Sequence, residues 1–63
     1  MITKVKNRLK KHRVLYTESG IPHGIQLKLA NGATVNVYNT NKVLVQGRQD
    51  IKKATEILLG LDI

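Results

Sequence analysis

The sequence contains no cysteine, so the chain forms no disulfide bond and offers no thiolate ligand to a metal ion. With 63 residues its core is small, and its stability must rest on good packing or on self-association. No apolar run approaches the roughly 20 residues that span a bilayer, and the N-terminus lacks the apolar core of a signal peptide. We therefore expect one soluble, cytoplasmic domain, residues 1–63, that does not associate with a membrane.

Acidic residues are also few. The chain has four, which are Glu18, Asp50, Glu56 and Asp62. Their positions indicate no carboxylate pair, and the two histidines, His12 and His23, have no cysteine or nearby acid to complete a metal site or a triad. The glycines do not form a phosphate-cradling loop either. We predict a protein that is not an enzyme and holds no cofactor or metal.

Positive charge is plentiful and unevenly placed. The first thirteen residues carry six cations and no acid, and they are Lys4, Lys6, Arg8, Lys10, Lys11 and Arg13. The other fifty residues contain five cations and four acids, so they contribute only +1 to the net charge of +7. This asymmetry favours a polyanionic partner such as nucleic acid. The alternative is a solvated helix that keeps a small protein soluble.

Apolar residues at helical spacing predict two helices. In residues 2–13 the stripe is Ile2, Val5 and Leu9, extended by His12 or Tyr16. A second helix is predicted to begin near Gln49 or Asp50 and to run to about Leu59, where Gly60 stops it. Its inward stripe is predicted to be Ile51, Ala54, Ile57 and Leu58.

Alternating residues between these helices predict strands over 24–30, 33–38 and 42–46. A three-residue loop ending at Gly32 pairs Leu27 with Val35 and Ile25 with Val37, and places apolar side chains on one face. The same loop type ending at Asn41 pairs Val37 with Val43 and Val35 with Val45. Residues 17–20 are interpreted as a connection, Ile21-Pro22 as the start of an extended segment, and residues 14–16 as a candidate edge strand.

The predicted fold is α+β: a helix, a three- to four-stranded antiparallel sheet and a second helix, with both helices on the apolar sheet face. The opposite face stays open. By the register above it presents Gln26, Lys28, Thr34, Asn36, Tyr38, Lys42, Leu44 and Gln46. Lysines neutralise phosphates, amides and hydroxyls bind backbone or sugar oxygens, and a tyrosine packs on a sugar or base. An ordinary solvent-exposed sheet face has a similar composition.

Residues 34–47 resemble a hairpin of a known family. The matching residues are Thr34, Tyr38, Lys42, Val43, Gln46 and Gly47. They are similar to the small N-terminal substrate-binding domain of bacterial ribonuclease HIII, whose fold is like half of the TATA-box-binding protein. The resemblance implies binding of RNA/DNA hybrid or duplex DNA by the sheet face, with Tyr38, Lys42 and Gln46 in contact.

Two departures from that family matter. Asn41 stands where the family has a turn glycine, and the sequence has no counterpart of the catalytic ribonuclease domain, so cleavage is not implied. Residues 21–24 and Asn31-Gly32 also look like a small domain that accompanies bacterial nucleotide-binding proteins with a TIR-like domain.

These observations predict a non-catalytic module that binds duplex DNA or RNA/DNA hybrid largely independently of sequence. The predicted contact residues are Lys4, Arg8, Lys11, Lys28, Asn36, Tyr38, Lys42, Gln46 and Arg48. Open sheet edges would also allow pairing with a second copy as a homodimer. The alternatives are a small protein-interaction module of phage or mobile-element type, which binds or inhibits a host protein, and an accessory domain for nucleotide binding.

Overall fold

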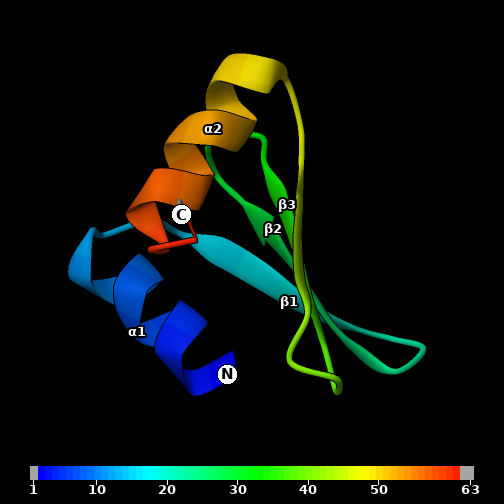
Figure 1. Cartoon of the computed structure of the whole chain (residues 1–63). Helices are drawn as coiled ribbons and strands as arrows, with labels where there is room; N and C mark the ends of the chain where they lie inside the picture. Colours follow the sequence, from blue (N-terminus) through cyan, green and yellow to red (C-terminus); the bar gives the residue numbers. More distant parts are fainter. Residues whose placement is uncertain (1, 62–63) are drawn as a thin grey trace.

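The computed structural model describes residues 2–61, so one of the four acidic residues, Asp62, lies outside the described residues. The elements in chain order are α1 (Ile2–Lys11), β1 (Tyr16–Ile21), β2 (Gly24–Leu29), β3 (Thr34–Tyr38), β4 (Val43–Gln46) and α2 (Gln49–Leu58). Both helices lie on one side of a four-stranded antiparallel sheet (Figure 1). The predicted α+β class and element order are therefore confirmed.

Helix α1 is two residues shorter than predicted. The amides of Arg13 and Val14 donate to the carbonyls of Lys10 and Leu9, at 3.1 and 2.9 Å, which closes the helix end. This closure requires a left-handed residue, and Arg13 supplies it with φ of 57°. His12 is exposed, so it does not extend the apolar stripe. Val5 and Leu9 are buried as predicted.

Helix α2 ends in the same way, with glycine at the left-handed position. Gly60 has φ of 74°, and its amide and that of Leu61 donate to the carbonyls of Ile57 and Glu56. The predicted stop is confirmed.

The predicted inward stripe of α2 is partly wrong. Ala54 is exposed and Ile57 keeps 56% of its surface exposed. The face that meets the sheet instead includes Ile51, Thr55 and Leu58 at helical spacing. Thr55 is 1% exposed, and its hydroxyl accepts a hydrogen bond from Asn31 Nδ2 at 3.3 Å. This hydrogen bond satisfies the buried hydroxyl of Thr55, a polar residue that a search for a purely apolar stripe does not identify.

The sheet order is β1-β2-β3-β4, with each strand beside its chain neighbour. The predicted register between β2 and β3 and between β3 and β4 is confirmed, including Leu27 opposite Val35 and Val35 opposite Val45. Gly32 and Asn41 adopt left-handed conformations, with φ of 95° and 66°, as both loops require.

Strand β1 corrects the interpretation of residues 17–20 as a connection. All six residues pair with β2, from Tyr16 opposite Leu29 to Ile21 opposite Gly24. The edge strand predicted over residues 14–16 therefore starts later and runs further. Pro22 and His23 form the tight turn that joins β1 to β2, with His23 at φ of 63°. Most of β1 is polar and exposed because the strand is at the sheet edge. The apolar alternation by which a strand is recognised is therefore not evident in its sequence.

The core lies between the helices and one sheet face. Its buried residues are Val5, Leu9, Leu27, Leu29, Ala33, Val35, Val37, Val45 and Leu59. Tyr16 packs against this cluster from β1, not from α1 as an extension of the helical stripe. Within residues 2–61 the helices are too short to cross a membrane.

Candidate nucleic-acid interface

The open sheet face carries three rows of side chains, because directly opposite residues of antiparallel strands share a face. The first row is Thr17, Lys28, Thr34 and Gln46, and the second is Ser19, Gln26, Asn36 and Leu44. The third is Ile21, Gly24, Tyr38 and Lys42. Lys42 belongs to this row because its carbonyl accepts a hydrogen bond from the Tyr38 amide at 2.8 Å. We refer to these rows as the open face. It presents hydroxyls, amides, two lysines and one phenol, together with the apolar side chains of Ile21 and Leu44.

Asn36 lies in the middle of the open face and is the most unusual residue there. It is 7% exposed, although neither helix covers this face. Its Nδ2 atom donates to the Tyr38 hydroxyl at 3.3 Å, while its Oδ1 atom is buried without a hydrogen-bond partner among residues 2–61. An unpaired buried acceptor of this kind costs about 1–3 kcal/mol.

Gly24 brings β2 and β3 close together beside Tyr38. A Cβ atom at Gly24 would lie 2.3 Å from the carbonyl oxygen of Val37 and 2.9 Å from the Cα atom of Tyr38. Both of these atoms belong to the backbone, which cannot yield without distorting the sheet. Glycine is therefore required at this position of the third row.

Charge on the open face is of one sign. Lys28 and Lys42 are exposed, and among residues 2–61 no carboxylate belongs to any of the three rows. Glu18 is directly opposite Leu27, so it belongs to the covered face, and Asp50 and Glu56 are on α2. A phosphate backbone laid across the open face would meet cations and neutral donors without opposing charge.

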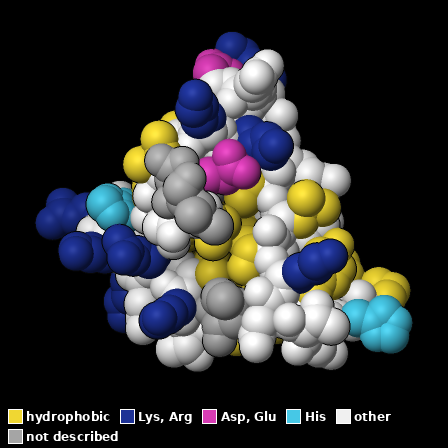
Figure 2. All heavy atoms as spheres, viewed as in Figure 1, with side chains coloured by type: hydrophobic (Ala, Val, Ile, Leu, Met, Phe, Trp, Pro, Cys, Tyr) yellow, Lys and Arg dark blue, Asp and Glu magenta, His cyan; other side chains and the backbone are white. Residues whose placement is uncertain are grey.

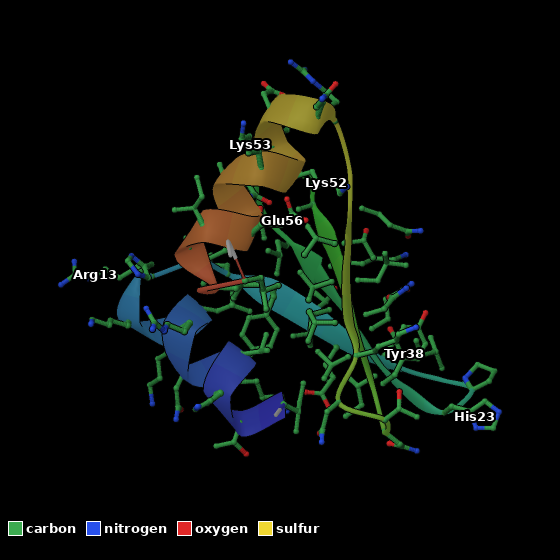
Figure 3. The ribbon with its side chains drawn as sticks, in the orientation of Figure 1. Arg13, His23, Tyr38, Lys52, Lys53 and Glu56 are labelled. Atoms are coloured by element: carbon green, nitrogen blue, oxygen red, sulfur yellow. The ribbon has the colours of Figure 1, made fainter. Side chains whose placement is uncertain are left out.

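The basic residues of α1 form a second, separate surface. Lys4, Arg8 and Lys11 are exposed, and α1 lies on the opposite side of the sheet from the open face. Figure 2 shows dark-blue side chains gathered over α1, and Figure 3 places Arg13 and Tyr38 on opposite sides of the molecule. The nine predicted contact residues are therefore not one site. The structure brings together Lys28, Asn36, Tyr38, Lys42 and Gln46 and separates them from those on α1.

Arg48 belongs to neither group. It immediately precedes α2, is exposed, and its Nη2 atom lies 3.4 Å from Asp50 Oδ2. This ion pair neutralises part of the local charge, although exposed pairs of this kind contribute little to stability.

One cation of α1 forms an ion pair with an acidic residue of β1. Lys6 Nζ lies 2.5 Å from Glu18 Oε1, and this pair ties α1 to β1. The hydrogen bond from Lys6 to the Glu18 carboxylate, helped by the attraction between their charges, raises the pKa of Lys6 above its ordinary value of 10.5. The other cations of residues 4–13 have no acidic partner among the ion pairs of residues 2–61.

Besides Ile21 and Gly24 of the third row, sequence reasoning missed two polar residues of the open face, Thr17 and Ser19. Both belong to β1, which was interpreted as a connection. Their spacing of two residues, between the more apolar Tyr16 and Ile21, is a weak strand signal that could have placed them. In residues 2–61 no three residues of the types His, Cys, Asp and Glu cluster as a metal would require.

No family model matches this chain, and neither the search of curated proteins nor that of solved structures found a match. The resemblance to the ribonuclease HIII domain thus stays a prediction that rests on the quoted residues.

Proposed function

We propose that the chain is a non-catalytic nucleic-acid-binding module whose open face contacts duplex DNA or RNA/DNA hybrid, largely independently of sequence. The observation that supports this proposal most is the composition of that face. Neither helix covers it, it carries Lys28, Lys42 and a series of neutral hydrogen-bonding groups, and it has no carboxylate within the described residues. The absence of cysteine agrees with action in the cytoplasm.

The dimensions of the sheet suit a short stretch of duplex. Four strands spaced about 4.8 Å apart place the two edge strands roughly 15 Å from each other. This width corresponds to about four or five base pairs, since each rises about 3.4 Å. In this proposal the two lysines neutralise phosphates, the amides and hydroxyls bind sugar or phosphate oxygens, and Tyr38 packs on a sugar or base.

The α1 cations act at a distance in this proposal. Lys4, Arg8 and Lys11 lie on the other layer of the molecule, so a short duplex on the open face does not touch them. Their charge still contributes to the positive field that raises the rate of encounter with a polyanion, and salt screens this effect.

The test is fluorescence anisotropy with RNA/DNA hybrid, duplex DNA and single-stranded DNA of matched sequence at several salt concentrations. If binding uses Lys28 and Lys42, the slope of log affinity against log salt is about −2. If binding uses the cations of α1, the slope approaches about −5. Absence of binding at low salt overturns the proposal.

Two matched double variants separate the surfaces. Lys28→Gln with Lys42→Gln and Lys4→Gln with Lys11→Gln each remove two positive charges from exposed positions. We expect the first pair to weaken equilibrium binding at least tenfold and the second to reduce mainly the association rate. The reverse result would move the interface from the open face to α1.

A further inference from the structure

A hollow of ≈ 350 Å³ lies where the C-terminal half of α1 meets the segment that leads into β1. Val14, Leu15 and Tyr16 contribute its apolar side chains, while Lys10 and Arg13 stand among its other lining residues. It is separate from the open face, because α1 lies on the covered side of the sheet. Nothing in the proposed nucleic-acid contact uses this hollow.

Leu15 is the residue that marks this surface as unusual. Its side chain is 77% exposed, more than any other large hydrophobic residue in the described chain. A second hollow, ≈ 330 Å³, is also lined by Leu15 and Tyr16 and continues to Leu29 and Ala30. Its lining includes Thr17 and Lys28, so this hollow borders the first row of the open face. Leu15 therefore borders both hollows, which suits a ligand that is extended and carries more than one apolar group.

The neighbouring strand offers backbone hydrogen bonds to such a ligand. Within residues 2–61, β1 pairs with β2 alone and is an edge strand of the sheet. Its outer edge therefore presents amide and carbonyl groups that a further strand can pair with. Addition of an extended peptide to a sheet edge, with side-chain pockets alongside, is a common mode of peptide recognition.

Charge identifies the kind of peptide. Lys6 of this hollow is already paired with Glu18, but Lys10 and Arg13 have no acidic partner among the ion pairs of residues 2–61. A partner segment that seats there must bring acidic residues to balance them. We propose that the surface formed by the two hollows and the β1 edge, which we call the α1–β1 surface, binds an extended acidic segment of a partner protein that also carries apolar side chains.

A peptide fits this surface better than a second stretch of nucleic acid does. A phosphate backbone satisfies Lys10 and Arg13 but leaves Leu15 exposed and cannot pair in register with the backbone of β1. The segment proposed here covers the leucine, completes the strand edge and neutralises the cations together.

The experiment uses the full chain and a fluorescein-labelled peptide, Asp-Leu-Glu-Val-Asp-Val-Glu-Leu. One control peptide has serine at the apolar positions with the charge unchanged, and the other has lysine at the acidic positions. We expect saturable binding of the first peptide at micromolar to submillimolar concentration and at least tenfold weaker binding of both controls. Amide shifts in an NMR titration should concentrate on residues 13–19.

Variants of the protein complete the test. Leu15→Ser should weaken peptide binding about tenfold, which corresponds to the loss of one buried leucine contact. Leu44→Ser removes an exposed leucine from the open face and should leave peptide binding unchanged. Leu15→Ser should also leave nucleic-acid affinity unchanged, so failure of this proposal is distinguishable from failure of the proposed function.

Three results would overturn the proposal. The first is equal binding of the serine-substituted peptide, which would reduce the interaction to charge alone. The second is loss of nucleic-acid binding in Leu15→Ser, which would assign the surface to nucleic acid. The third is a concentration-dependent dimer in sedimentation that Leu15→Ser dissociates, which would make a second copy of the chain the occupant.

Discussion

Replacing Asn36 with leucine should make the protein more stable and its nucleic-acid binding weaker. Asn36 is buried on the open face, and its Oδ1 atom has no hydrogen-bond partner in the described part of the chain. Leucine has a similar size and no polar atoms, so it removes the unsatisfied acceptor. A stabilising substitution at the centre of a proposed binding face would indicate that asparagine is present there for binding.

The expected gain follows from two opposing terms. Removing the unpaired acceptor contributes about 1–3 kcal/mol to the free energy of unfolding. Losing the hydrogen bond from Asn36 Nδ2 to the Tyr38 hydroxyl, which is long at 3.3 Å, costs about 1 kcal/mol at most. Tyr38 is only half-buried, so its hydroxyl can turn to water instead. The net gain is about 1 kcal/mol, which raises Tm by roughly 5 °C in a domain of this size.

Urea unfolding followed by circular dichroism measures this change, with Gln26→Leu as the matched control. Gln26 is opposite Asn36 in the same row but is only half-buried, so its replacement should change the free energy of unfolding by less than about 0.5 kcal/mol. Nucleic-acid affinity of Asn36→Leu should fall several-fold. A loss of stability of about 1 kcal/mol or more would refute the reasoning, because it would show that Oδ1 is satisfied in solution.

Three further outcomes are expected. Gly24→Ala should lower the free energy of unfolding by more than about 2 kcal/mol, because the new Cβ would lie 2.3 Å from the Val37 carbonyl oxygen. A soluble variant of unchanged stability would contradict this prediction. Arg13→Gly should raise the free energy of unfolding by about 1 kcal/mol, as glycine adopts φ of 57° without strain, and thermal unfolding would detect the change. The raised pKa of Lys6 means that its pairing with Glu18 stabilises fully below pH 10.5 and is lost as pH rises above that value. Urea unfolding at several alkaline pH values should show this loss in the native chain and not in Glu18→Gln.

The parts of the fold that sequence predicted well are those where two patterns agree. In the hairpins, alternation alone leaves the register open, but the left-handed positions at Gly32 and Asn41 fix the loop length and thereby the pairing of Leu27 with Val35. The end of α2 is similar, since Gly60 follows the last apolar residues directly. In these segments the local backbone requirements and the apolar periodicity predict the same structure.

Prediction failed where the local sequence pattern did not indicate the structure that the residues adopt. Strand β1 is polar because it is at the sheet edge, so nothing in its composition separates it from a loop. Thr55 is buried because Asn31 from a distant loop donates to its hydroxyl, and no local pattern reveals such a partner. For a related reason, the sequence did not reveal that the predicted contact residues lie on two separate surfaces. Charge and alternation identified both surfaces, but only the packing of α1 shows that they belong to opposite layers.

The order of the strands has a consequence for how fast the protein folds. Every strand pairs only with its neighbours along the chain, and each connection is short, so the sheet is built from local hairpins. Hairpins of this kind form within about 1–10 μs, and low contact order accompanies rapid folding. A much longer stretch of chain separates α1 from the end of α2, where a Cβ atom at Gly60 would lie 3.6 Å from Arg8 Nη2. We expect docking of α1 beside α2, rather than assembly of the sheet, to limit the folding rate. Substitutions at Val5 or Leu59 should then slow folding more than substitutions in the hairpin loops.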